Sequence, residues 1–93
     1  MPAPDQIIDA AMAGSLQADA IRTHSLVAWI VTRDEVAYPG EFVGRLMTSG
    51  PTSYVMTARA LAELQARLPA GLTRIDRQPA DPPEVVEVWF PAP

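Results

Sequence analysis

Four residues in the middle of the chain have side chains that could bind a small anion or carry out acid–base chemistry. Arg33, Arg45 and Tyr54 supply N–H and O–H donors, and the planar arginine fork suits carboxylates and phosphates. Glu41 would act as the base if it were partly buried. These residues form a candidate ligand site only if they converge in one concave pocket. The alternative is that Arg45 pairs with Glu41 or Glu87 across neighbouring strands, which contributes little.

Other kinds of chemistry have less support in the sequence. There is no cysteine, which excludes disulfides, thiolate metal sites and a cysteine nucleophile. His24 is the single histidine, so a catalytic triad or a histidine metal site lacks partners nearby. Asp34, Glu35 and Glu41 do not have the spacing of a calcium loop. We therefore predict no metal, no other cofactor and no catalytic set, and we favour a non-enzymatic role.

The charge balance argues against a nucleic-acid partner. Seven arginines stand against eleven Asp and Glu residues, which gives a net charge of −4. Nucleic-acid binders usually present a basic face that neutralises phosphates. All the cations are arginine, lysine and asparagine are absent, and alanine and proline are abundant, a composition typical of a GC-rich bacterial genome.

The length and hydropathy pattern predict one small domain. A chain of 93 residues with 48% hydrophobic residues can build one modest core. It holds no run of about 20 apolar residues that would cross a bilayer. The first residues are acidic, whereas a secretory signal begins with a basic region. We therefore expect a cytoplasmic protein without a membrane partner.

Residue patterning predicts an α+β fold with a small, mostly antiparallel sheet of order β-β-β-α-β and one helix packed on a face. We expect residues 1–22 to form an N-terminal extension or weak helix and residues 23–93 to form the single α+β domain. The last strand would pair parallel to the first or second strand through a crossover. Pattern and turn residues predict strands at 26–32, 41–47, 53–57 and 85–90, a helix at 58–68, an extended or irregular stretch at 72–75 and a loop at 77–84.

The two helical segments differ in the strength of their signals. Leu61, Leu64 and Leu68 form one apolar stripe, and Thr57 is a candidate N-cap. Residues 5–22 have helical spacing that Gly14 interrupts. Three alternatives remain for this segment: a docked helix, a partner-binding helix or a frayed extension.

Two tryptophans on predicted strands are candidates for an interface. Trp29 and Trp89 fit either the core or an anchor in a contact with another chain. In the last strand, alternation places Val86 with Val88 on one face and Val85 with Trp89 on the other. If that strand is an edge, Val85 and Trp89 would meet a second copy of the chain.

The sequence resembles a group of small bacterial proteins that lends no activity. The resemblance covers about residues 25–90 and is carried by Ala37–Leu46, Tyr54–Met56, Leu61–Leu64, Leu68–Arg74 and Val86–Trp89. A fainter resemblance, in element order alone, is to HicB-type antitoxin domains. Their usual Gly-Cys and Thr-x-Glu-Glu-Ala signatures are missing, because Thr57 is followed by Ala-Arg-Ala.

Taken together, these features favour a non-catalytic protein-interaction module that binds a second copy or another protein. The alternatives are a small anion-binding or metabolite-binding protein or enzyme, and an antitoxin-like regulator. The discriminating observation is whether the four candidate ligand residues share a pocket.

Overall fold

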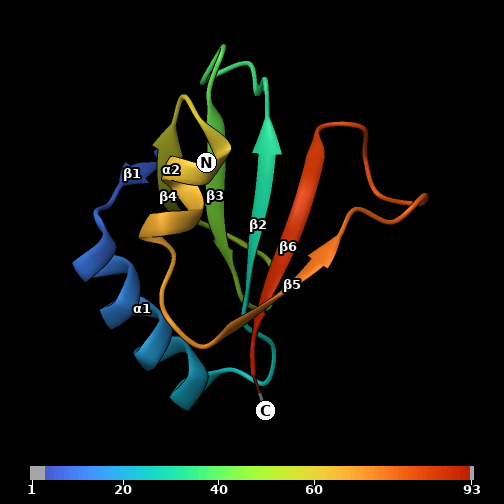
Figure 1. Ribbon diagram of the computed structural model, residues 1–93. Helices are drawn as coiled ribbons and strands as arrows, with labels where there is room; N and C mark the ends of the chain where they lie inside the picture. The colour runs from blue at the N-terminus through green and yellow to red at the C-terminus, as the bar shows by residue number, and fades with distance from the viewer. Residues whose placement is uncertain (1–3, 93) are drawn as a thin grey trace.

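The computed structural model describes residues 4–92, which form a six-stranded sheet with two helices on one of its faces (Figure 1). The strand order is β1-β4-β3-β2-β6-β5, so two edges remain, at β1 and at β5. The elements are β1 (Gln6–Ile7), α1 (Ala10–Thr23), β2 (Ala28–Arg33), β3 (Phe42–Met47), β4 (Pro51–Ala58), α2 (Leu61–Arg67), β5 (Leu72–Asp76) and β6 (Val85–Pro91).

The predicted α+β class and the mostly antiparallel sheet are confirmed. Strands β3 and β4 form the expected hairpin, and among the described strands the two-residue β1 alone pairs in parallel, with β4. The last strand, however, is antiparallel to β2, whereas the sequence predicted parallel pairing. The cause is the strand β5, which lies where the sequence predicted an extended or irregular stretch. It forms a hairpin with β6 and thereby reverses the direction in which β6 enters the sheet.

Helix α1 is docked on the sheet. It begins after Asp9, whose Oδ1 accepts the Met12 N–H over 2.8 Å, so the N-cap lies four residues beyond the predicted helix start. The preceding residues are extended and add β1 to the sheet. Ala13, Gln17 and Ala20 are buried, which places one face of this helix in the core.

The helices and the sheet enclose one core. Its largest fully buried side chains include Trp29, Met56 and Leu64. Leu64 of α2 lies over Gly44 of β3, where an added Cβ would meet the leucine side chain at 3.6 Å, an ordinary contact distance. The predicted Thr57 cap is wrong, because β4 continues to Ala58 and holds Thr57 opposite Val43. Helix α2 begins instead after Ala60, without a side-chain cap.

The opposite face of the sheet is covered over one half only. The loop between β2 and β3 crosses this face, because Tyr38 in the loop donates to Asp5, which binds Arg45 on the same face. Val43 and Val55 beneath it are fully buried. The other half, over β2, β6 and β5, is covered by neither of the two described helices, and we call it the open face. Its apolar side chains include Ile30, Val85, Val88 and Phe90, with Met47 of β3 at the margin, all half-buried, and Ile75, which is exposed.

Candidate functional site

Arg45 is the centre of a polar cluster that joins three segments of the chain. Its Nη1 donates to Asp5 Oδ1 over 2.7 Å and its Nη2 to Asp5 Oδ2 over 3.0 Å, a two-pronged contact that suits the guanidinium geometry. Nη1 also donates to the Thr52 carbonyl oxygen over 2.9 Å. Glu35 adds a second carboxylate, with Oε1 at 3.6 Å from Nη2. The arginine fork is therefore already engaged within the chain.

The electrostatics of this cluster follow from the same contacts. The hydrogen bonds from Arg45 lower the pKa of Asp5, although partial burial opposes the shift. Burial raises the pKa of Tyr38, and the bond from its hydroxyl to Asp5 Oδ2, at 2.8 Å, raises it further. The bond to Asp5 likewise raises the pKa of Arg45. Near neutral pH, Asp5 and Arg45 are thus a charged pair that holds the N-terminal segment against the sheet.

The four candidate ligand residues do not converge. Arg45 lies opposite Val55, so the adjacent Tyr54 points to the other face, where it packs against the helix-side core. Arg33 lies opposite Phe42, again on the helix side, and lines a hollow with Arg77. Glu41 precedes β3, and its carbonyl accepts the Asp34 N–H. The condition set for a ligand site, convergence in one pocket, is not met, because alternation along β3 and β4 separates Arg45 from Tyr54.

A small hollow lies beside Arg45 where the open face begins. Its volume is about 170 Å³, and its lining is mainly apolar. Thr32, Glu35 and Arg45 form its polar side, and the Thr32 hydroxyl donates to the Glu35 carboxylate. It is lined by Ile30, Thr32, Glu35, Arg45, Met47 and Pro51.

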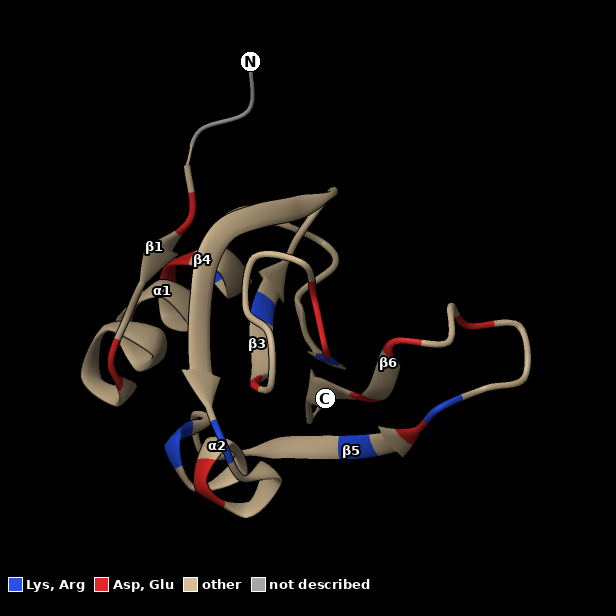
Figure 2. Ribbon diagram, turned by 90° about the horizontal axis from the view of Figure 1, so that it is seen from above, with Lys and Arg blue, Asp and Glu red and all other residues tan. Residues whose placement is uncertain are grey.

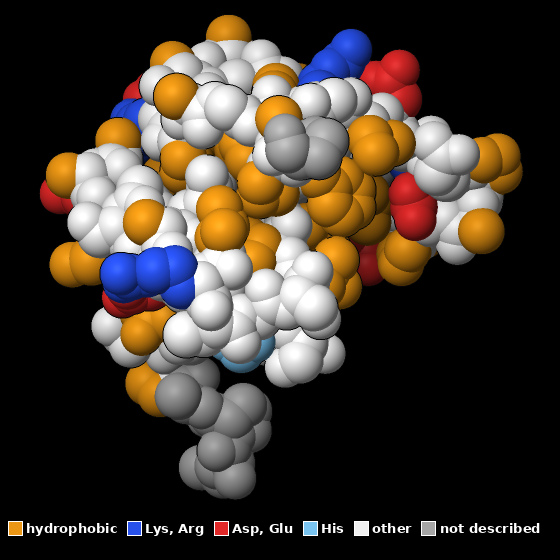
Figure 3. Space-filling model, turned by 90° about the horizontal axis from the view of Figure 1, so that it is seen from below, with side chains coloured by type: hydrophobic (Ala, Val, Ile, Leu, Met, Phe, Trp, Pro, Cys, Tyr) orange, Lys and Arg blue, Asp and Glu red, His pale blue; other side chains and the backbone are white. Residues whose placement is uncertain are grey.

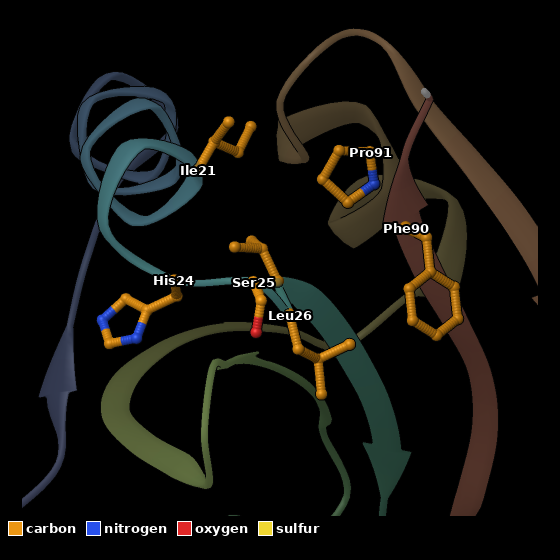
Figure 4. A pocket seen from close by; sticks show the side chains of 7 residues that line it. Ile21, His24, Ser25, Leu26, Phe90 and Pro91 are labelled. Atoms are coloured by element: carbon orange, nitrogen blue, oxygen red, sulfur yellow. The ribbon is translucent and has the colours of Figure 1, made fainter.

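His24 lines a second, more open hollow of about 280 Å³ at the end of the sheet where β2 begins and β6 ends. Figure 3 shows hydrophobic side chains gathered on this end of the molecule. In Figure 4 the imidazole points away from Phe90 and Pro91, which form the opposite wall. Among the described residues that line this hollow, Ser25 is the other one with a polar side chain.

Comparison with protein families, with curated proteins and with solved structures finds no match to this chain. The two resemblances stated from the sequence therefore stay predictions. Within residues 4–92, no three histidine or carboxylate side chains are grouped in a way that could hold a metal ion. The described helices include none that is long and apolar enough to cross a membrane. Figure 2 shows basic positions scattered over several elements instead of gathered on one face.

The tryptophans predicted at an interface face the helices. Trp29 is fully buried, and its Nε1 donates to Gln17 Oε1 over 2.8 Å. Trp89 lies opposite Trp29 and is half-buried. Val85 lies opposite Thr32, on the other face of the sheet from Trp89. The predicted shared face of Val85 and Trp89 is wrong, because a β-bulge between them shifts the alternation by one residue.

The bulge also separates Val86 from Val88. Val86 packs with the helix-side core, whereas Val88 lies on the open face opposite Ile30. The strand β6 that holds these residues is not an edge, because β2 and β5 flank it on both sides. A second copy therefore cannot pair with β6 as the sequence predicted, because neither side of β6 is free.

Sequence reasoning missed a buried carboxylate on β6. Glu87 is only 2% exposed and accepts hydrogen bonds from Gln65 Nε2, at 3.0 and 3.2 Å, and from Trp89 Nε1. Arg74 of β5 has its Nη1 3.8 Å from Glu87 Oε1. These contacts link α2, β5 and β6. The alternating sequence around Glu87 indicated a strand but not which face would be covered.

The free edge at β5 was missed as well. Ile75 is 42% exposed, and the side chains of Arg74 and Asp76 are 49% and 77% exposed, with Arg74 Nη1 2.7 Å from Asp76 Oδ1. The sequence signal was present, since Thr73 and Ile75 are β-branched and alternate with Leu72 and the two charged residues.

Proposed function

We propose that this chain is a non-catalytic protein-interaction module that assembles as a homodimer through the β5 edge of its sheet. The observation that carries the proposal is that β5 is a five-residue strand with a single neighbour, β6, among the strands of residues 4–92. The outer edge of such a strand presents N–H and C=O groups that a second strand can pair with. Ile75, exposed at this edge, adds apolar surface that a partner would cover.

The two edges of the sheet are not equivalent, and this favours β5. The β1 edge is only two residues long. Asp5, just before it, is tied to Arg45 and Tyr38. Strand β5 has no proline within it, and its two charged side chains have opposite signs. A strand with one cation and one anion is suited to pairing with a second copy of itself, which offers the same two charges in reverse order.

Anion binding at Arg45 has less support. The guanidinium already binds Asp5 through both of its terminal nitrogens, and Glu35 lies near Nη2. An added phosphate or carboxylate would have to displace Asp5. The antitoxin alternative has support from element order alone, and fold-level likeness is weak evidence for function.

Sedimentation velocity on the purified chain, from micromolar to near-millimolar concentration, tests the proposal. We expect the sedimentation coefficient to rise with concentration towards the value of a dimer. Ile75→Lys should abolish the rise, because two like charges would meet at the edge and a lysine there opposes strand pairing. Val36→Lys is the matched control, since Val36 is fully exposed in a loop away from β5. A wild-type chain that stays monomeric throughout this range refutes the proposal.

A further inference from the structure

The backbone hydrogen bonds identify which groups of β5 face outward. Ala92 N donates to Gly71 O over 2.9 Å, so these opposed residues form a hydrogen-bonded pair. The register from Leu72 opposite Pro91 to Asp76 opposite Glu87 is uninterrupted. Hydrogen-bonded and non-hydrogen-bonded pairs alternate along an antiparallel ladder, so Thr73 and Ile75 bond to β6. The peptide groups of Leu72, Arg74 and Asp76 therefore point away from the sheet.

We infer that β5 pairs antiparallel with β5 of a second copy, with Ile75 on the two-fold axis and Arg74 opposite the partner's Asp76. This inference rests on the proposed homodimer and specifies its geometry. In this register the outward peptide groups of Arg74 meet those of the partner's Asp76, and the symmetry repeats the pairing on the other side of the axis. The two Ile75 residues form the non-hydrogen-bonded pair between these bonded pairs.

Several registers would let the outward peptide groups of the two β5 strands hydrogen-bond to each other. Among them, the side-chain charges favour the register with Ile75 on the axis. An axis at Arg74 would place two arginines opposite each other, and an axis at Asp76 would place two carboxylates opposite each other, which is unfavourable. An axis at Thr73 would place Arg74 opposite the partner's Leu72 and would leave Asp76 beyond the paired strand. Only the axis at Ile75 gives two pairs of opposite charge.

The side chains agree with this placement. Arg74 and Asp76 lie on the helix side of β5, opposite Trp89 and Glu87, and already contact each other within the strand. Each can exchange that contact for the same contact across the axis. Exposed ion pairs contribute little free energy, so their effect is to set the register and not to drive association. Ile75 lies on the open face next to Val88, and its exposed side chain would be covered by its counterpart.

Engineered cysteines read the register directly, because the chain contains no cysteine of its own. In the inferred pair the two Ile75 Cα atoms are about 4.5 Å apart, which a disulfide can span. We expect Ile75→Cys to form a disulfide-linked dimer under mild oxidation. Thr73→Cys is the matched control on the same face of the same strand. Its two copies would be about 13 Å apart, so it should stay monomeric.

The outcomes separate this inference from the homodimer itself. If the wild-type chain is monomeric at all concentrations and neither cysteine variant cross-links, the proposed homodimer is refuted. If the wild-type chain is a dimer but its Ile75→Cys variant does not cross-link, only the inferred register is refuted. Efficient cross-linking of Thr73→Cys would move the axis to Thr73 and overturn the inference.

Charge reversal supplies an independent test. Arg74→Asp and Asp76→Arg each place like charges opposite each other in a dimer of identical chains, so each variant alone should dimerise more weakly than the wild type. An equimolar mixture should form heterodimers, because each cation then meets an anion of the other chain. The mixture does not restore the contact within either strand, so recovery on mixing reports the contact between chains. Circular dichroism checks folding, since Arg74→Asp places a carboxylate near Glu87. Folded single variants that dimerise as strongly as the wild type, or a mixture that dimerises no more strongly than either variant alone, would overturn the inference.

Discussion

The bond between Trp29 and Gln17 fixes helix α1 to the sheet, so its loss should cost measurable stability. The indole N–H donates to Gln17 Oε1 over 2.8 Å, with Trp29 fully buried and Gln17 only 8% exposed. Gln17→Met preserves the length of the side chain but removes the acceptor, which leaves the indole N–H buried without a partner. Such a donor costs about 1–3 kcal/mol. A loss of about 2 kcal/mol lowers the Tm of a domain of this size by about 8–16 °C.

Thermal and urea unfolding followed by circular dichroism would measure this loss. Gln6→Met is the matched control, because Gln6 is exposed in β1 and its substitution should change the unfolding free energy by less than about 0.5 kcal/mol. The pair can be isolated by combining Gln17→Met with Trp29→Phe in a double-mutant cycle, for which we expect a coupling of about 1 kcal/mol or more. A Gln17→Met variant as stable as the Gln6→Met control would refute the docking of α1 through this bond.

Two further predictions concern charged groups elsewhere in the fold. Since Arg45 lowers the pKa of Asp5, their pair stabilises the fold above the ordinary carboxyl pKa and loses this effect as pH falls through the lowered value. The difference in urea midpoint between wild type and Asp5→Asn should therefore shrink between about pH 5 and pH 2. A difference that grows on acidification would contradict this prediction. Gln65→Leu removes the amide that donates to the buried carboxylate of Glu87, so it should lower the unfolding free energy by about 1–3 kcal/mol. The control in the same urea assay is Gln6→Leu, which should leave the unfolding free energy unchanged. Equal stability of the two variants would contradict this prediction.

The parts of the fold that depend on local pattern were predictable from the sequence. Alternation in residues 41–47 and 85–90 predicted strands, and the structure has them at Phe42–Met47 and Val85–Pro91. The leucine stripe predicted a helix that contains Leu61–Arg67. In each case hydrophobic periodicity and flanking turn residues agree, and the tertiary contacts reinforce them.

The polar cluster was not predictable, because it depends on contacts between distant segments. Arg45 and Asp5 are 40 residues apart in the sequence. Asp5 follows Pro4, a combination typical of a helix start, but Asp9 supplies the cap instead. The extended residues before Asp9 gain hydrogen bonds from pairing with β4, including one from Ile8 N to Val55 O over 2.9 Å. This pairing, and not local propensity, carries Asp5 to Arg45.

The position of the free edge shows why an interface is harder to predict than a strand. With four strands expected, the last strand was a candidate edge, and its exposed face was assigned to Val85 and Trp89. The residues Leu72–Asp76 form an additional strand on the outer side of β6, so the edge of the sheet lies at β5 and not at β6. The bulge in β6 then turns Val85 and Trp89 to opposite faces. The exposed apolar residue at this edge is therefore Ile75, with the opposite charges of Arg74 and Asp76 on either side of it.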